Sequence, residues 1–208
     1  MNDTIKIYVP DPTYDNPDYY PGLDENEASD KFREHFEKDF REKYKNDAFA
    51  IGKIASANIG DGADFPAIVA EIMPYIVAAS PIYIFFKGKD IRDNIHAWLD
   101  IGKMLLNISS NIRIYFSRSA AFLIGLSHIG KITKVKSLKL SSYKWEDARF
   151  CLDWKSVLPA SDNSVANQPP EEHLSGCVHI FKVIVNDQEF IVRVFNNMVH
   201  IEPQQQDY

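Results

Sequence analysis

Cysteine is scarce in this sequence, whose 208 residues include only Cys151 and Cys177. Two cysteines cannot build the disulfide framework that holds small secreted domains together, so we expect a reducing compartment and a cytoplasmic location. Together with His173 and His179, the two cysteines could be the four ligands of a zinc ion. However, the spacing lacks the tight paired clips of common zinc fingers. We therefore expect neither a metal nor another cofactor.

Catalytic signatures are missing as well. Ser117, Ser119 and His128 are residue types that serve in hydrolases, but the chain has no G-x-S-x-G elbow. No acid lies between Asp100 and Glu146 that would orient the histidine locally. The sequence therefore favours a binding protein over an enzyme.

One loop keeps an enzymatic alternative open. Gly60–Asp64 is rich in glycine, and a loop of this kind before a helix can bind phosphate. Asp61 and Asp64 would repel phosphate, and no lysine follows as in a P-loop. The two aspartates could instead hold a divalent cation. The alternative function is then a metal-dependent enzyme that acts on nucleotides or nucleic acid.

Acidic residues are absent between Ile101 and Trp145, although the whole chain has a net charge of −6. A basic segment in an acidic protein is typical of an electrostatic contact surface. The alternative is that its charges pair with the protein's own acidic regions or are simply solvated. Besides Lys103, the window contains seven basic residues that we take as candidate binding residues: Arg113, Arg118, Lys131, Lys134, Lys136, Lys139 and Lys144.

The longest apolar run lies between Phe65 and Leu106. Asp64 before Pro66 resembles a helix start, and Ser80-Pro81 repeats the signal, so two helices are predicted in 65–86. Apolar spacing of three and four residues predicts another helix over 90–107.

A second alternative function follows from the length of this run. The segment 66–86 is about as long as a membrane span, which would make the protein a membrane-associated accessory protein. The basic segment 131–144 would then face the lipid. Glu71, Pro74 and Pro81 interrupt the run and argue against this alternative.

Strand and helix signals alternate through the rest of the first two-thirds. Strands are expected at 5–9, 54–59 and 112–116, and helices at 27–45 and 120–129. Ser117 is the expected cap of the last helix and Gly130 its expected end. The segment 11–26 contains several tyrosines and prolines. We interpret it as a surface loop that packs on the domain, or alternatively as a strap that contacts a partner.

The last third is rich in strand signals. Strands are expected at 134–140 and 148–154, followed by a long polar loop over 156–175. Three further strands, 178–185, 188–195 and 198–202, form a meander whose turns are Asn186-Asp187 and Asn196-Asn197. These turns place four pairs opposite each other: Val183 and Phe190, Phe181 and Val192, His179 and Val194, Val194 and Val199. The other face of the meander is expected to be half exposed.

These patterns predict an α/β (α+β) fold. Strand–helix units with an apolar helical centre occupy 1–130, and a mostly antiparallel β part occupies 131–208, either separately or as one continuous domain. We expect a non-enzymatic interaction protein that contacts an anionic or acidic macromolecular partner, a protein or a polyanion. Its contact surfaces would be 131–144 and the C-terminal meander. The sequence predicts no oligomeric state.

Overall fold

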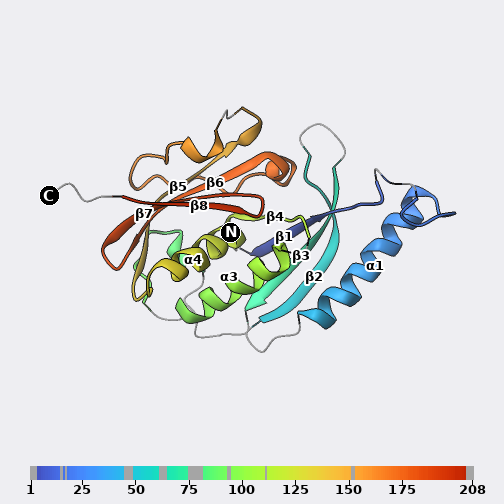
Figure 1. The fold of residues 1–208 in the computed structure, drawn as a ribbon, viewed down its shortest axis with the longest axis horizontal. Coiled ribbons are helices and arrows are strands. Elements are labelled where there is room, and N and C mark those ends of the chain that lie inside the picture. The colour runs from blue at the N-terminus through green and yellow to red at the C-terminus, as the bar shows by residue number, and fades with distance from the viewer. Residues whose placement is uncertain are drawn as a thin grey trace.

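Strands in the described part of the chain form two antiparallel sheets of four (Figure 1). The computed structural model describes residues 4–14, 16, 18–44, 49–60, 65–74, 82–92, 95–110, 112–150 and 153–204. The first sheet has the order β2-β3-β1-β4, with β1 (Ile5–Pro10), β2 (Phe49–Asn58), β3 (Pro66–Pro74) and β4 (Tyr115–Phe116). The second has the order β5-β6-β7-β8, with β5 (Leu138–Asp147), β6 (Cys177–Val185), β7 (Gln188–Phe195) and β8 (Met198–Pro203). The predicted mixture of helices and antiparallel strands is confirmed.

Helix α4 (Arg118–Ile132) lies at the centre and contacts strands of both sheets. Most of its residues are buried, on every side of the helix. Helix α3 (Ile95–Ser109) packs beside it, closely enough that a Cβ built on Gly102 would lie 2.2 Å from the carbonyl oxygen of Leu123. On another side, a Cβ on Gly125 would lie 2.6 Å from Val192 of β7. Glycine is therefore required where α4 meets each neighbour.

Helix α1 (Glu25–Lys43) begins with a capping box in which Asp24 accepts from the Glu27 N–H. Its arginines attach it to β2: Arg33 donates to the Ser56 hydroxyl, and Arg41 donates to the carbonyl oxygens of Ile51 and Gly52. In Figure 1 the helix lies beside the first sheet, at the end of the molecule remote from the second sheet.

The meander is confirmed in detail. All four predicted cross-strand pairs occur, including Phe181 with Val192. Asn186 and Asp187 have φ of 50° and 67°, and Asn196 has φ of 52°. These values suit a tight turn between strands and are tolerated by Asn and Asp. The predicted helix at 90–107 corresponds to α3, the helix at 27–45 to α1, and the cap Ser117 to the start of α4.

The prediction of a helix in the first part of 65–86 is wrong. Residues 66–74 form β3, the strand between β1 and β2, in which Ala67, Ile68, Ala70 and Ile72 are buried. The membrane-anchor alternative therefore loses its basis in this segment. Among the described residues no helix has the length and apolar character of a membrane span. Helix α2 (Ile82–Phe85) agrees with the prediction, whereas 75–81 lies outside the described residues.

Other boundaries also differ from the predictions. Residues 112–114 and 134–137 are not strand, and the strand predicted at 148–154 is replaced by two short 3-10 helices. These are η1 (Ala148–Phe150) and η2 (Trp154–Ser156). Helix α4 passes through Gly130 and ends at the cap Thr133, because Gly130 lies against Leu99 of α3 in helical conformation.

The second face of the meander is partly buried and partly exposed, as expected. Ile180 and Ile191 are buried beneath Trp154 and Val157 from the segment after β5. Arg193 is only 2% exposed, and its Nε donates to the Val157 carbonyl oxygen at 2.9 Å. This segment therefore covers part of the face, while Lys182, Glu189 and His200 remain partly exposed.

We predict that Phe181→Ala lowers the free energy of unfolding by about 3–5 kcal/mol. Phe181 is fully buried and contacts the rings of Tyr143 and Phe122, with centroids 4.9 and 5.7 Å away. Denaturant melts measure the loss. Met198→Ala is the matched control, because Met198 is 44% exposed and its loss should stay near 0.5 kcal/mol. Equal losses in the two variants would contradict the packing.

We also predict that Gly102→Ala destabilises the protein by about 1–3 kcal/mol. In an unconstrained helix the same change stabilises by about 1 kcal/mol. The sign therefore tests the close approach of α3 and α4, because the added methyl group must displace the Leu123 backbone. A thermal melt gives the answer, and a stabilised variant would refute the proposed contact. Lys103→Ala, on the exposed side of α3, controls for helix propensity.

Candidate functional site

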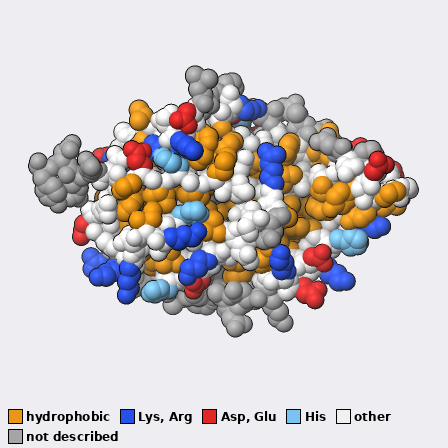
Figure 2. Space-filling view, in the orientation of Figure 1, with side chains coloured by type: hydrophobic (Ala, Val, Ile, Leu, Met, Phe, Trp, Pro, Cys, Tyr) orange, Lys and Arg blue, Asp and Glu red, His pale blue; other side chains and the backbone are white. Residues whose placement is uncertain are grey.

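Four lysines gather where α4 ends and β5 begins. Lys131, Lys134, Lys136 and Lys139 are all exposed, and none forms an ion pair with a described residue. We call these four residues the basic edge. Figure 2 shows Lys and Arg side chains gathered at this end of the molecule, at the lower left. The charge predicted from the sequence therefore reaches solvent at this place.

The backbone of the basic edge is held in place from the β6–β7 turn. The side chain of Asn186 accepts from the N–H groups of Lys136 and Ser137, at 2.8 and 3.1 Å. Its amide nitrogen donates to the Lys134 carbonyl oxygen at 2.7 Å. Three hydrogen bonds from one side chain fix the path of 134–137, so the lysines project from an ordered segment.

A second stretch of chain adds charge to the same edge. Ile91 pairs with Leu138 through two backbone hydrogen bonds of 2.8 and 3.0 Å. This pairing brings the exposed residues Lys89, Asp90 and Arg92 beside the start of β5. A pocket of about 320 Å³ lies next to them, between the end of α4 and the start of α3, and its polar lining residues are His96, Lys131, Thr133 and Lys134.

The structure does not bring the other three candidate binding residues to the basic edge. Arg118 is only 9% exposed, and its guanidinium lies 4.1 Å from the centre of the Phe86 ring and donates to the Ala166 carbonyl oxygen at 2.7 Å. Lys144 forms an ion pair with Glu146 at 2.9 Å. Arg113 precedes α4 and lies over the Tyr115 ring, so the length of that helix separates it from Lys131.

The residues considered for hydrolysis serve the fold. Ser117 caps α4, accepts from the Lys6 N–H at 3.0 Å and donates to the Thr4 carbonyl oxygen. Ser119 is fully buried. Burial lowers the pKa of His128, with a smaller contribution from Lys131.

The residues considered for zinc are not arranged as ligands. Burial raises the pKa of the Cys177 thiol far above its ordinary value, which keeps it protonated. Both ring nitrogens of His179 are already hydrogen-bonded. Cys151 and the aspartates Asp61 and Asp64 lie outside the described residues. Within the part of the chain that the structure describes, no group of three or more His, Cys, Asp and Glu could hold a metal ion.

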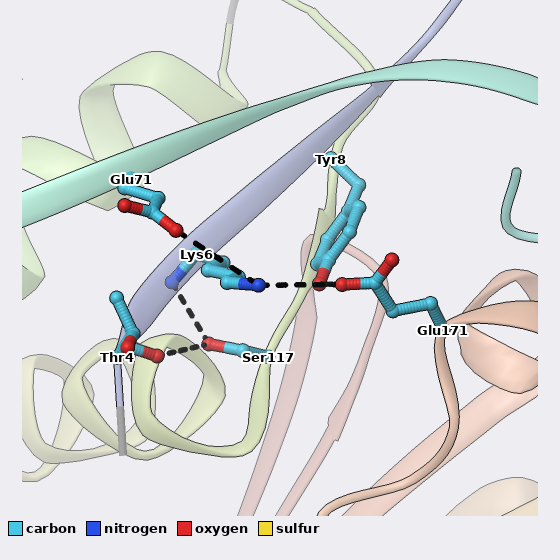
Figure 3. Close-up of polar contacts among 6 residues, drawn as sticks. All are labelled: Thr4, Lys6, Tyr8, Glu71, Ser117 and Glu171. Carbon is cyan, nitrogen blue, oxygen red and sulfur yellow. Dashed lines mark hydrogen bonds and ion pairs between the residues drawn. The ribbon is translucent and has the colours of Figure 1, made fainter. Parts of the chain in front are cut away.

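A polar cluster attaches the segment before β6 to the first sheet (Figure 3). Glu171, in η3 (Glu171–Gly176), accepts from the Tyr8 hydroxyl at 2.8 Å and pairs with Lys6 at 3.3 Å. The Lys6 ammonium also lies 4.0 Å from Glu71. Burial and the hydrogen bond to Glu171 raise the pKa of Tyr8, which therefore remains a hydrogen-bond donor. These contacts support the fold.

A buried histidine connects the two sheets. Because a carbonyl oxygen only accepts, Nε2 of His179 must donate to the Phe116 oxygen of β4, at 3.0 Å. Nδ1 then accepts from the Tyr143 hydroxyl of β5, also at 3.0 Å. The pKa of His179 is lowered to about 4, mainly by burial; the Phe116 hydrogen bond opposes this effect, and the Arg118 charge makes a smaller contribution in the lowering direction. The ring is neutral at neutral pH.

A large apolar recess lies along α1. Two adjoining cavities of about 560 and 630 Å³ share Tyr19, Phe32 and Ile112 in their walls. We call them together the aromatic groove. One wall is the aromatic stripe of α1 (Phe32, Phe36, Phe40 and Tyr44), and the other includes Ile112. Figure 2 shows hydrophobic side chains exposed at this end of the molecule, on the right.

The segment 11–26, which was expected to be a tyrosine-containing surface loop, contributes Tyr14, Tyr19 and Tyr20 to the lining of this groove. The Tyr19 ring packs edge-on against Phe32, with centroids 6.0 Å apart. The Tyr20 hydroxyl is hydrogen-bonded to Nδ1 of His35 at 2.9 Å. Both tyrosines therefore pack on α1, and the groove is formed jointly by α1 and the segment 11–26.

Comparisons with protein-family models, with curated proteins and with solved structures give no significant match.

We predict an acid-dependent loss of stability that originates at His179. An unfolded histidine has a pKa near 6.5, so between that pH and about 4 only the unfolded chain takes up the proton. The free energy of unfolding should therefore fall by about 3 kcal/mol as pH falls through this range, and this contribution should then level off. Denaturant melts at about pH 7 and about pH 4.5 cover most of the change.

His179→Gln provides the comparison for this prediction. Glutamine can donate to Phe116 and accept from Tyr143, but it cannot take up a proton. The stability of the variant should depend less on pH over the same range, by up to about 3 kcal/mol. Parallel pH profiles for the two proteins would show that His179 is not the titrating group.

Proposed function

We propose that the protein is a non-enzymatic binding protein that contacts an acidic macromolecular partner through the basic edge. One observation carries the proposal: four exposed lysines between 131 and 139 have no ion-pair partner among the described residues, in a chain of net charge −6. Internal pairing, the alternative reading of these lysines, has no support from any described carboxylate. Unpaired charge of one sign attracts a partner of the opposite sign.

The chemistry of the edge favours an acidic protein over a nucleic acid. Phosphate recognition commonly uses the planar guanidinium of arginine, which binds two oxygens at once. The basic edge consists of lysines, and Arg118 is buried under Ala166 and Phe86. The net negative charge of the whole chain would also repel a polyanion as extended as a nucleic acid.

The meander contributes less to the proposed surface than its sequence suggests. The first face of β6 and β7 is buried and part of the second is covered, so these strands reach solvent less than β8 and the turn at Asn186-Asp187 do. That turn contacts the basic edge through Asn186. The proposed contact surface therefore consists of the four lysines and the adjoining turn. A cytoplasmic location is part of the proposal and is supported by the low cysteine content.

The test changes Lys134, Lys136 and Lys139 together to Gln. Fluorescence anisotropy with a labelled poly-glutamate peptide should show weaker binding by about tenfold, because three exposed charge pairs contribute about 0.5 kcal/mol each. Binding of the unchanged protein should also weaken as salt rises, since the charges are exposed to solvent.

The matched control changes Lys31, Lys53 and Lys155 to Gln. These lysines are exposed, lie away from the basic edge and give the same change in net charge. The control should bind poly-glutamate nearly as tightly as the unchanged protein. Equal losses in both variants would mean that net charge alone is measured. Tighter binding of a DNA duplex or of phosphatidylserine vesicles than of poly-glutamate would overturn the choice of an acidic protein.

A further inference from the structure

We propose that the aromatic groove binds an amphipathic helix of a partner protein, with its apolar face in the groove and acidic side chains along its flanks. The groove lies along α1, whereas the basic edge follows the end of α4. The inference therefore concerns a second surface and does not depend on the function proposed for the lysines.

The apolar wall has the periodicity of a helix surface. Phe32, Phe36, Phe40 and Tyr44 follow one another at four-residue intervals, with neighbouring ring centroids 6.2, 5.0 and 5.0 Å apart. Four residues of α-helix rise about 6 Å. A partner helix with apolar side chains three and four residues apart presents ridges of the same spacing. Such ridges can interdigitate with the partly buried rings of Phe32, Phe36 and Tyr44, whereas Phe40 is buried.

The groove is open where a partner would enter. Tyr19 and Ile112, which belong to both cavities, are 43% and 37% exposed. Phe32 and Phe36 are only partly buried, although phenylalanines in a packed core are usually enclosed. Apolar side chains exposed together in this way mark interaction surfaces on soluble proteins.

The charges around the groove indicate which charge the flanks of the ligand should have. Lys38 and Lys43 line it on α1, and Arg113 lines it beside Ile112. Asp39 is the exposed acid among the lining residues, while Asp11 is buried and already accepts hydrogen bonds from Thr13 and Ser29. The solvent-facing lining is therefore predominantly basic. Acidic side chains on both flanks of an apolar stripe complement it.

Three synthetic peptides of about four helical turns test the inference. The first has leucines three and four residues apart and glutamates on the flanks. The second replaces the glutamates with lysines, and the third keeps the glutamates but replaces the leucines with serines. Fluorescence anisotropy at physiological salt should show binding of the first peptide, with the other two weaker by at least about tenfold.

Variants of the groove locate the binding site. Ile112→Glu places a negative charge, of the same sign as the peptide's glutamates, at an exposed position in the groove wall. It should weaken binding of the first peptide by at least about tenfold. The double variant Lys38→Glu and Lys43→Glu should weaken the first peptide and strengthen the second. Ile112→Leu keeps the apolar wall and should bind like the unchanged protein.

The lysine triple variant of the basic edge separates the two proposals. If the groove is the site, Lys134, Lys136 and Lys139 changed together to Gln should leave the binding of the first peptide unchanged. Equal binding of the first and third peptides, or full binding by Ile112→Glu, would overturn the inference. A loss of first-peptide binding in the basic-edge variant alone would also overturn it. So would binding of a long-chain fatty acid in place of the peptide.

Discussion

The burial of α4 is the constraint on which the rest of the structure depends. Because this helix contacts both sheets and α3, nearly every position in it must be apolar or small. Gly102 and Gly125 remove the side chains that would keep α3 and β7 apart from it. The hydrogen bond from His179 to the Phe116 carbonyl oxygen then joins the sheets directly, next to the start of the helix. The basic edge follows the end of this helix, whereas the aromatic groove lies along α1, which is attached to β2.

The local sequence patterns predicted those elements that have one apolar face and one polar face. Helices α1 and α3 and the register of the meander followed from apolar spacing and from turn residues that tolerate positive φ. Strand β3 was misread because Ala67, Ile68, Ala70 and Ile72 are buried in the middle of a sheet. A strand buried in this way has no polar alternation, so its apolar run resembles a buried helix. The β-branched Ile68, Val69 and Ile72 were the available signal.

The candidate surfaces were predicted less completely, because long-range contacts decide which charges reach solvent. Lys131, Lys134, Lys136 and Lys139 followed from the absence of local acids. The burial of Arg118 depends on Ala166 and Phe86, which lie far from it in the sequence. The aromatic groove was missed because its walls come from four separate segments of the chain, 9–20, 32–44, 65–66 and 112–113.

Burial accounts for only part of the window without acidic residues. At the buried positions of α3 and α4 an unpaired carboxylate would have a large desolvation cost. Beyond Ile132 buried and exposed side chains alternate, and Lys134, Lys136 and Lys139 are among the exposed ones, so burial does not explain why acids are missing at those positions. The four lysines form no ion pair with a described residue, although Asp90 and Asp187 lie in the adjoining segments. Their exposure distinguishes Lys134, Lys136 and Lys139 from Arg118, whose charge is enclosed by the fold.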